Sequence, residues 1–236
     1  MCLDALGAEA ARPYTERAEP RHPSLIDVAH LVDERFGVVN IPNSIWIDEA
    51  GMIVRPAEPA WPDAPAEPDA PDEAQREDPA PQAAEPPPGR LGEMMATAGQ
   101  IVTDRATYLG ALHDWIEHGA ASAFALAPGE VIARSGRRDA EQATAAAEFE
   151  LGQHLYRSGD LEGGRAHFRE AQRLQPDNWT YKRQAWSLEP SAFDGPLARF
   201  WQGPLPDRES DWPYEGDWVT DAKATGPANY YPRFQR

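Results

Sequence analysis

Few residues in this sequence could do chemistry by their type and spacing. The chain contains a single cysteine, Cys2, which excludes an internal disulfide. A thiol reacts as the thiolate, which forms at a helix N-terminus or beside a positive charge. Cys2 instead lies in an expected strand next to Asp4. We therefore predict that Cys2 is a small buried apolar residue and that the chain has no catalytic residue.

The histidines form no recognisable metal site. His113 and Glu117 are one helical turn apart and could share a metal ion. Two ligands do not complete a site, however, and an exposed helix face explains the spacing better. Four further histidines show no ligand spacing: His22, His30, His154 and His167. We expect His22 and His30 to be surface or helix-capping residues, and we predict neither a metal nor a cofactor.

The composition limits the classes to which the chain can belong. Its 236 residues can form one large domain or two small ones, and a hydrophobic fraction of 41% is sufficient for a core. The 24 prolines and the formal net charge of −17 indicate that part of the chain is not packed. An acidic protein is a poor ligand for nucleic acids and anionic membranes. We find no signal peptide or membrane span, so a cytoplasmic location is expected.

The most informative stretch is Phe36–Pro56, which predicts a β-hairpin. β-Branched and aromatic residues in Ser44–Ile47 and in Met52–Arg55 are typical of two short strands. Between them Asp48 begins a segment of turn composition, in which Gly51 can adopt positive φ. The two strands are therefore expected to pair in antiparallel fashion.

Alternating strands and helices are expected before the hairpin. Met1–Leu3 predicts a strand fragment, Gly7–Arg17 a helix rich in alanine and glutamate, and Leu25–Asp27 a second short strand. A helix over Ala29–Arg35 follows. Its predicted inner face consists of Leu31, Val32 and Phe36.

This order of elements, with Ile41-Pro42 ahead of the hairpin, resembles the C-terminal half of a thioredoxin domain, and most of all TlpA/ResA-like redoxins. The run Trp46–Ile53 matches the redoxin strand and turn. In that family the residue before a cis-proline pairs through its backbone with substrate. The resemblance therefore implies a cis Ile41-Pro42 bond and a substrate-binding role for both residues. The family's Cys-x-x-Cys segment would precede Met1, so a truncated gene product or an inactive relic is expected.

A proline-rich segment is expected to separate two domains. Prolines recur at every third residue from Pro56 to Pro71 and continue to Pro88, with acidic and alanine residues between them. Such a period is typical of polyproline II, a semi-rigid spacer. An SH3-type ligand is the alternative, but those ligands carry a basic anchor. We predict a thioredoxin-like domain over 1–56 and a linker over 57–90 that packs against neither neighbour.

A helical domain is predicted over 91–190. Weak helical character in Met94–Val102 is followed by a clear helix over Thr103–Gly119. The predicted inner face of that helix consists of Leu109, Leu112 and Ile116.

Residues 145–178 predict a helical hairpin. Its large, small and turn residues are Leu151, Gly152, Leu155, Gly159, Gly164, Phe168, Ala171 and Pro176. The small residues allow two antiparallel helices to approach closely, and the large ones fill the space between them. This spacing resembles a tetratricopeptide (TPR) repeat, although Glu148 stands where that motif prefers tryptophan. The resemblance implies a protein partner, and a further helix over Trp179–Leu188 is expected to cap the repeat.

The C-terminal residues 191–236 are rich in aromatic residues and proline. We expect an irregular segment that is anchored to the core by its aromatic side chains, with an aromatic ligand platform as the alternative.

The predicted fold class is therefore α/β, an incomplete thioredoxin-like domain, plus an all-α TPR-like domain, joined by a proline-rich linker. Two functions stay open. One is a redoxin-family protein related to thiol–disulfide oxidoreductases and peroxide reductases, fused to a TPR-like interaction module. The other is a non-enzymatic adaptor that binds partner proteins through its helical repeat.

Overall fold

The computed structural model describes residues 1–61, 89–192 and 202–235. These residues form two compact units, each made of segments far apart in the sequence. Unit 1 comprises Met1–Glu58 and Leu126–Asp217, and unit 2 comprises Pro59–Ala125 and Trp218–Arg236. The fold is mixed, with helices and two small two-stranded sheets in the described residues. The structure thus groups the chain differently from the expected order of segments 1–56, 57–90, 91–190 and 191–236.

The N-terminal part of unit 1 alternates strands and helices, as the sequence predicts. Its elements are β1 (Cys2–Leu3), α1 (Ala8–Ala18), β2 (Ile26–Asp27) and α2 (Leu31–Phe36). Strands β1 and β2 pair in parallel, with Cys2 opposite Ile26. Parallel strands require a crossover connection, which α1 supplies here.

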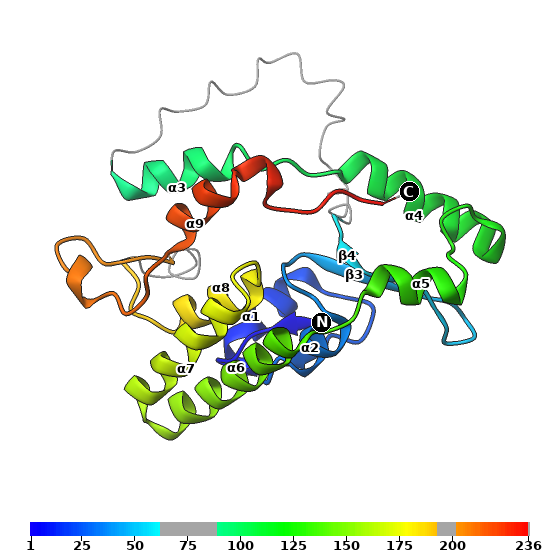
Figure 1. Ribbon diagram of the computed structural model, residues 1–236. Coiled ribbons are helices and arrows are strands. Elements are labelled where there is room, and N and C mark those ends of the chain that lie inside the picture. The colour runs from blue at the N-terminus through cyan, green and yellow to red at the C-terminus, as the bar shows by residue number, and fades with distance from the viewer. Residues whose placement is uncertain (62–88, 193–201, 236) are drawn as a thin grey trace, which may run out of the picture. The chain divides into compact units, whose positions relative to one another are not determined.

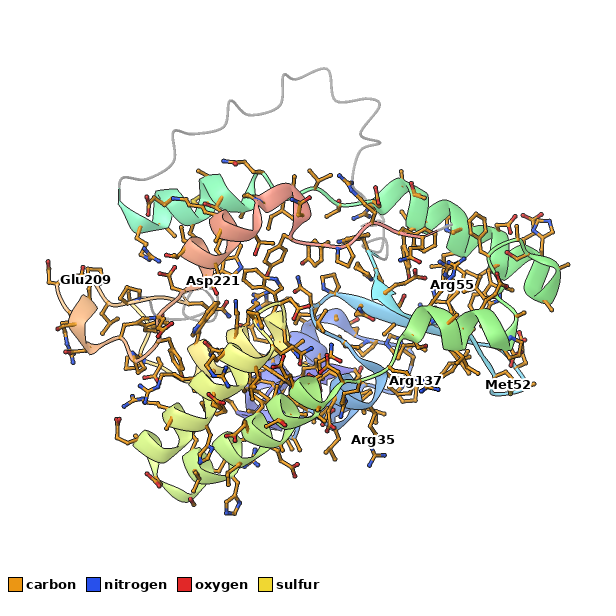
Figure 2. All side chains as sticks on the ribbon, in the orientation of Figure 1. Arg35, Met52, Arg55, Arg137, Glu209 and Asp221 are labelled. Atoms are coloured by element: carbon orange, nitrogen blue, oxygen red, sulfur yellow. The ribbon has the colours of Figure 1, made fainter. Side chains whose placement is uncertain are left out.

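The predicted hairpin is confirmed as β3 (Asn43–Ile47) paired with β4 (Ile53–Pro59). Asp48 organises its turn, because Oδ1 of Asp48 accepts hydrogen bonds from the N–H groups of Ala50 and Met52 at 3.0 and 2.8 Å. Gly51 adopts a φ of +78°, a conformation that favours glycine. Figure 2 labels Met52 at the tip of this hairpin.

Strand β4 continues into the region that was expected to be linker, and this part of the prediction is wrong. The reason is an ion pair along the strand. Arg55 is fully buried, lies 5.4 Å from the ring centroid of Trp46, and donates from Nη2 to Glu58 Oε2 at 3.0 Å. Glu58 therefore belongs to the packed hairpin, and Ala60 after it is also buried. Expected linker residues 62–88 lie outside the described part of the chain.

Unit 1 continues with the helices α5 (Pro128–Ser135), α6 (Ala140–Ser158), α7 (Leu161–Leu174) and α8 (Trp179–Ser187). Helices α6 and α7 form the predicted helical hairpin, with Gly159 at a φ of +94° in the turn. Asp139 and Asp160 cap the two helices through side-chain hydrogen bonds to Gln142 N and Gly163 N. Figure 1 shows α6, α7 and α8 in green and yellow beside the blue N-terminal elements of the same unit.

The core of unit 1 joins the helical hairpin to the N-terminal elements. Phe149 on α6 stacks on Tyr181 of α8 at 4.3 Å between ring centroids and meets Phe168 of α7 at 5.5 Å. The ring of Phe149 also contacts His30, ahead of α2, in an edge-to-face arrangement at 5.2 Å. The expected TPR-like segment is therefore part of the same packed unit as the expected redoxin-like segment.

Unit 2 contains the remaining elements: α3 (Arg90–Ala98), α4 (Arg105–His118), η2 (Gly119–Ala121), α9 (Trp218–Thr225) and η5 (Pro227–Asn229). Helices α3 and α9 pack together, as Figure 1 shows, and Lys223 pairs with Glu93 at 3.4 Å. The ring of Trp61 contacts Tyr108 and Tyr231, which draws the end of the first segment into this unit.

The C-terminal segment is more regular than predicted. It contains the short η4 (Glu209–Asp211) of unit 1 and the helix α9 of unit 2, so a wholly irregular segment is wrong. Its aromatic residues do anchor it, because Tyr214, Trp218, Tyr230 and Phe234 are all buried. Phe193, Phe200 and Trp201 lie outside the described residues.

Two predicted helix faces are only partly correct, because Val32, Leu109 and Leu112 are half-buried but the other predicted residues are exposed. In α2, Leu31 and Phe36 are 42% and 40% exposed, whereas Asp33 is buried through a polar contact with His30. In α4, Ile116 is 69% exposed and the buried positions are Tyr108 and Ala111. Aromatic packing onto Tyr108 selects that face, which apolar spacing alone did not reveal.

Candidate functional site

The loop from Val38 to Pro42 is the centre of the candidate site. The Ile41-Pro42 bond is cis, as expected. Asn40 is 3% exposed, and its Oδ1 accepts a hydrogen bond from the N–H of Ile41 at 2.9 Å. This bond occupies the Ile41 N–H, so a bound chain would meet the Ile41 side chain rather than that group.

The N-terminus of helix α8 is hydrogen-bonded to the backbone of this loop. The first N–H groups of a helix have no intrahelical acceptor. Here the N–H groups of Trp179 and Thr180 both donate to the carbonyl oxygen of Val39, at 2.6 and 3.2 Å. Thr180 Oγ1 donates to the carbonyl oxygen of Val38 at 3.3 Å, and Asn178 caps the helix by accepting from Tyr181 N at 3.1 Å. The start of α8 is therefore held against the backbone just ahead of the cis bond.

A cavity of about 150 Å³ lies beside this contact, entirely within unit 1. Its apolar walls come from β1, the following loop, the cis-proline loop and α8, through Leu3, Leu6, Ile41 and Trp179. Its polar walls include Asp4, His30, Arg183, Gln184, Ser187 and Gln202. Residues from five separate parts of the chain thus converge on one small space.

A buried polar network supports one wall of the cavity. His30 is 3% exposed, with Nδ1 2.8 Å from Asp33 Oδ2 and Nε2 3.0 Å from Gln184 Oε1. Gln184 Oε1 also accepts from the N–H of Ala5 at 3.1 Å. The network connects the chain after β1, the start of α2 and the middle of α8. It therefore fixes the relative positions of three of the elements that line the cavity.

The network also determines the protonation of His30. Gln184 Oε1 is an acceptor, so Nε2 carries a proton, and the Asp33 carboxylate favours a second proton on Nδ1. Burial lowers the pKa of His30, but the hydrogen bonds to Asp33 and Gln184 and the charges of Asp33 and Asp27 outweigh it and raise the pKa above its ordinary value. The imidazolium form is thus favoured. His30 is the N-cap residue of α2, as one expectation had it, but its side chain makes no capping hydrogen bond and is buried, so the expected surface location is wrong.

Cys2 is exposed, which contradicts the predicted burial. Successive residues of a strand point to opposite faces. Leu3 lines the cavity beside Ile41, whereas Cys2 lines a separate cavity with Ala8, Ala11 and Ser24. The thiol is therefore not one of the groups that surround Ile41.

Four of the eight TPR-like residues are buried at the interface between α6 and α7. Phe168 and Ala171 have no exposed surface, and Gly152 and Gly164 are buried between the helices. A Cβ atom on Gly152 would lie 2.7 Å from Phe168 Cδ1, which confirms the predicted close approach. Leu155 is half-buried, while Leu151, Gly159 and Pro176 are exposed. Glu148 accepts a hydrogen bond from His167 across the hairpin, and Phe149 supplies the buried aromatic ring that the sequence reasoning missed.

The described residues show neither a cluster of metal-ligating side chains nor a membrane-spanning helix. His113 and Glu117 are exposed on α4, and no group of three possible metal-ligating side chains occurs within the described residues. None of the helices in the described ranges is long and apolar enough to cross a membrane.

Comparison with known proteins gives no identification. No family model matches the sequence, and no curated protein or solved structure matches it either.

Proposed function

We propose that this chain is a thioredoxin-like protein that binds a polypeptide partner beside the cis-proline loop, with a TPR-like helical module forming part of the binding site. The observation that carries the proposal is the attachment of α8 to Val39, which places Trp179 and Ile41 on the walls of one cavity. In this proposal the loop that resembles a redoxin substrate loop and α8, the helix expected to cap the TPR-like repeat, belong to a single binding site rather than to two independent ones.

Binding, rather than thiol exchange, is the proposed activity of this chain. Exchange requires a thiolate at the substrate and a second thiol to resolve the mixed disulfide. The single cysteine of the sequence, Cys2, lines a different cavity from Ile41. The residues around Ile41 offer apolar surface, hydrogen-bonding groups and one arginine.

Binding can be tested with an extended polypeptide probe. Fluorescently labelled insulin B chain, with its cysteines carbamidomethylated, would be titrated with the protein and followed by fluorescence anisotropy. Ile41→Arg is expected to weaken binding about tenfold or more, equivalent to a loss of roughly 1.4 kcal/mol. Ile132→Arg is the matched control, because Ile132 is 73% exposed on α5 and does not line the cavity. Equal affinities for both variants and the unchanged protein would contradict the proposal.

Thiol chemistry is tested separately by insulin reduction. The chain and its Cys2→Ser variant are both expected to show no turnover above the rate without protein. Turnover that is lost in Cys2→Ser would make Cys2 a nucleophile and overturn the assignment of a binding function.

The adaptor function is a second candidate, in which a partner binds the outer surface of the helical hairpin. It is favoured by Leu151 on α6 and Leu161 on α7, which are 41% and 42% exposed. A Leu151→Arg, Leu161→Arg double variant distinguishes the two. Loss of probe binding in this variant, with normal binding by Ile41→Arg, would favour the hairpin surface over the cavity.

A further inference from the structure

We propose that the cavity beside Ile41 recognises a monocarboxylate that carries one apolar group. The carboxylate pairs with Arg183, and the apolar group lies among Leu3, Leu6, Ile41 and Trp179. This inference rests on the proposed function for the location of the site and adds the chemistry of the ligand.

Arg183 is placed to receive an anion. It lies one helical turn after Trp179 on α8, and both residues line the cavity. Nε of Arg183 donates to Gln202 Oε1 at 3.1 Å, and Gln202 Nε2 donates to the carbonyl oxygen of Arg183 at 3.4 Å. These bonds orient the guanidinium group and use one of its five N–H donors. Among the described residues neither Nη group has a hydrogen-bond partner, so both can bind the two oxygens of a carboxylate, a geometry that arginine favours.

Arg183 differs in this respect from two other arginines of the unit that are not exposed. Arg165 pairs with Glu189, and Arg55 pairs with Glu58. No carboxylate of a described residue lies within ion-pair distance of Arg183. In a chain with a formal net charge of −17, a half-buried arginine that forms no ion pair with a described residue is a notable feature of this cavity.

The size and walls of the cavity define the rest of the ligand. A volume of about 150 Å³ is comparable to cavities that hold a benzene molecule, and it therefore fits one side chain of the size of leucine or phenylalanine. Trp179 is 4% exposed and offers a rigid aromatic wall, while Leu3 and Leu6 supply aliphatic surface. The cavity itself accommodates a single terminal group, and the rest of a longer ligand would lie outside it.

The other polar groups favour one negative charge rather than two. His30 is hydrogen-bonded to both Asp33 and Gln184. Ser187 Oγ donates to the carbonyl oxygen of Gln184 and accepts from Gln184 Nε2. Asp4 also lines the cavity, where its Oδ1 accepts the N–H of Leu6 at 2.9 Å. A second anionic group would meet the Asp4 carboxylate, so dicarboxylates are disfavoured.

Two sources can provide this chemistry: the C-terminal residue of a polypeptide, or a free carboxylic acid. The probes are N-acetyl-leucine, N-acetyl-leucinamide, succinate, and an acetylated decapeptide ending in leucine with either a free or an amidated C-terminus. Binding to the full chain would be measured by isothermal titration calorimetry. The free acids should bind about tenfold or more tightly than the amides, because a charge-assisted hydrogen bond is lost in the amide. Succinate should bind more weakly than N-acetyl-leucine.

Variants of the protein test the same point. Arg183→Gln should weaken binding of N-acetyl-leucine about tenfold and abolish its preference over the amide, whereas Arg183→Lys should retain part of that preference. Arg35→Gln is the control, since Arg35 lies on the outside of α2 away from the cavity (Figure 2). Thermal unfolding of each variant verifies that it is folded. The comparison of free acids with amides is made on the unchanged protein and therefore does not depend on the folding of any variant.

The outcomes distinguish a polypeptide C-terminus from a free carboxylic acid as the ligand. They also distinguish failure of the carboxylate inference from failure of the proposed function. Tighter binding of the free-acid decapeptide than of N-acetyl-leucine identifies a polypeptide C-terminus, and equal binding identifies the free acid. Equal binding of acids and amides, or wild-type affinity in Arg183→Gln, would overturn the carboxylate inference. If the insulin B chain still binds in an Ile41-dependent manner in that case, the proposed function stands without it.

Discussion

Replacing Gly152 by alanine is expected to destabilise unit 1, although alanine is the better helix former. The added Cβ would lie 2.7 and 2.8 Å from two ring carbons of Phe168 and 3.1 Å from the carbonyl oxygen of Gly164. Phe168 has no exposed surface and cannot move aside without disturbing its neighbours. Overpacking of this kind costs up to about 3 kcal/mol, and the gain in helix propensity returns about 1 kcal/mol. The net loss is therefore roughly 2 kcal/mol.

The measurement is urea denaturation followed by circular dichroism. Gly129→Ala is the matched control, because Gly129 lies in helix α5 of the same unit and an added Cβ meets no atom within 4 Å. That variant should gain up to about 1 kcal/mol. A Gly152→Ala protein that is as stable as the wild type would refute the reasoning, since it would mean that α6 and α7 do not approach this closely.

Two further predictions concern charged groups of unit 1. Arg165→Gln should lower the free energy of unfolding by about 2 kcal/mol in urea denaturation, because the Glu189 side chain is only 4% exposed and would lose a bidentate partner. Arg173→Gln is the control: the side chains of Arg173 and its partner Glu170 are 66% and 40% exposed, so this variant should change stability by less than about 0.5 kcal/mol. Equal effects of the two substitutions would contradict the prediction. The raised pKa of His30, which faces the carboxylates of Asp33 and Asp27, means that protonation stabilises the fold. This stabilisation is complete below the unfolded pKa of about 6.5 and is lost as pH rises through the folded pKa. Denaturation over a pH series should show that loss in the wild type and a smaller one in His30→Gln, and identical pH profiles would exclude the role given to His30.

Local signals in the sequence were sufficient to predict the β3–β4 hairpin and the α6–α7 helical hairpin. Alternating β-branched residues around the turn at Asp48 predicted β3 and β4, and the proline at position 42 predicted the cis bond. The spacing of Gly152, Gly164 and Phe168 predicted the contact between α6 and α7. Each of these patterns arises from neighbours within a few residues or from two adjacent elements, which sequence periodicity records directly.

The candidate site could not be predicted in the same way. His30 and Gln184 are 154 positions apart, and no periodicity indicates that they meet. The attachment of α8 to Val39 is likewise a contact between distant backbone groups, which any residue type can make. The Ile41-Pro42 loop was predicted, and a second local signal was the three-residue spacing of His30 and Asp33, which allows a direct hydrogen bond. The apolar residues Leu31 and Phe36 drew attention to the wrong face.

The location of the binding site is the central claim, and site-specific photo-crosslinking tests it most directly. p-Benzoylphenylalanine would be introduced at Ile41 in one protein and at Ile132 in another, and each would be irradiated with the carbamidomethylated insulin B chain. Ile41 lines the cavity beside α8, and Ile132 is an exposed isoleucine outside it. We predict a cross-link from position 41, competed by N-acetyl-leucine, and none from position 132. Absence of a product at position 41, or equal yields at both positions, would contradict a binding site beside the cis-proline loop.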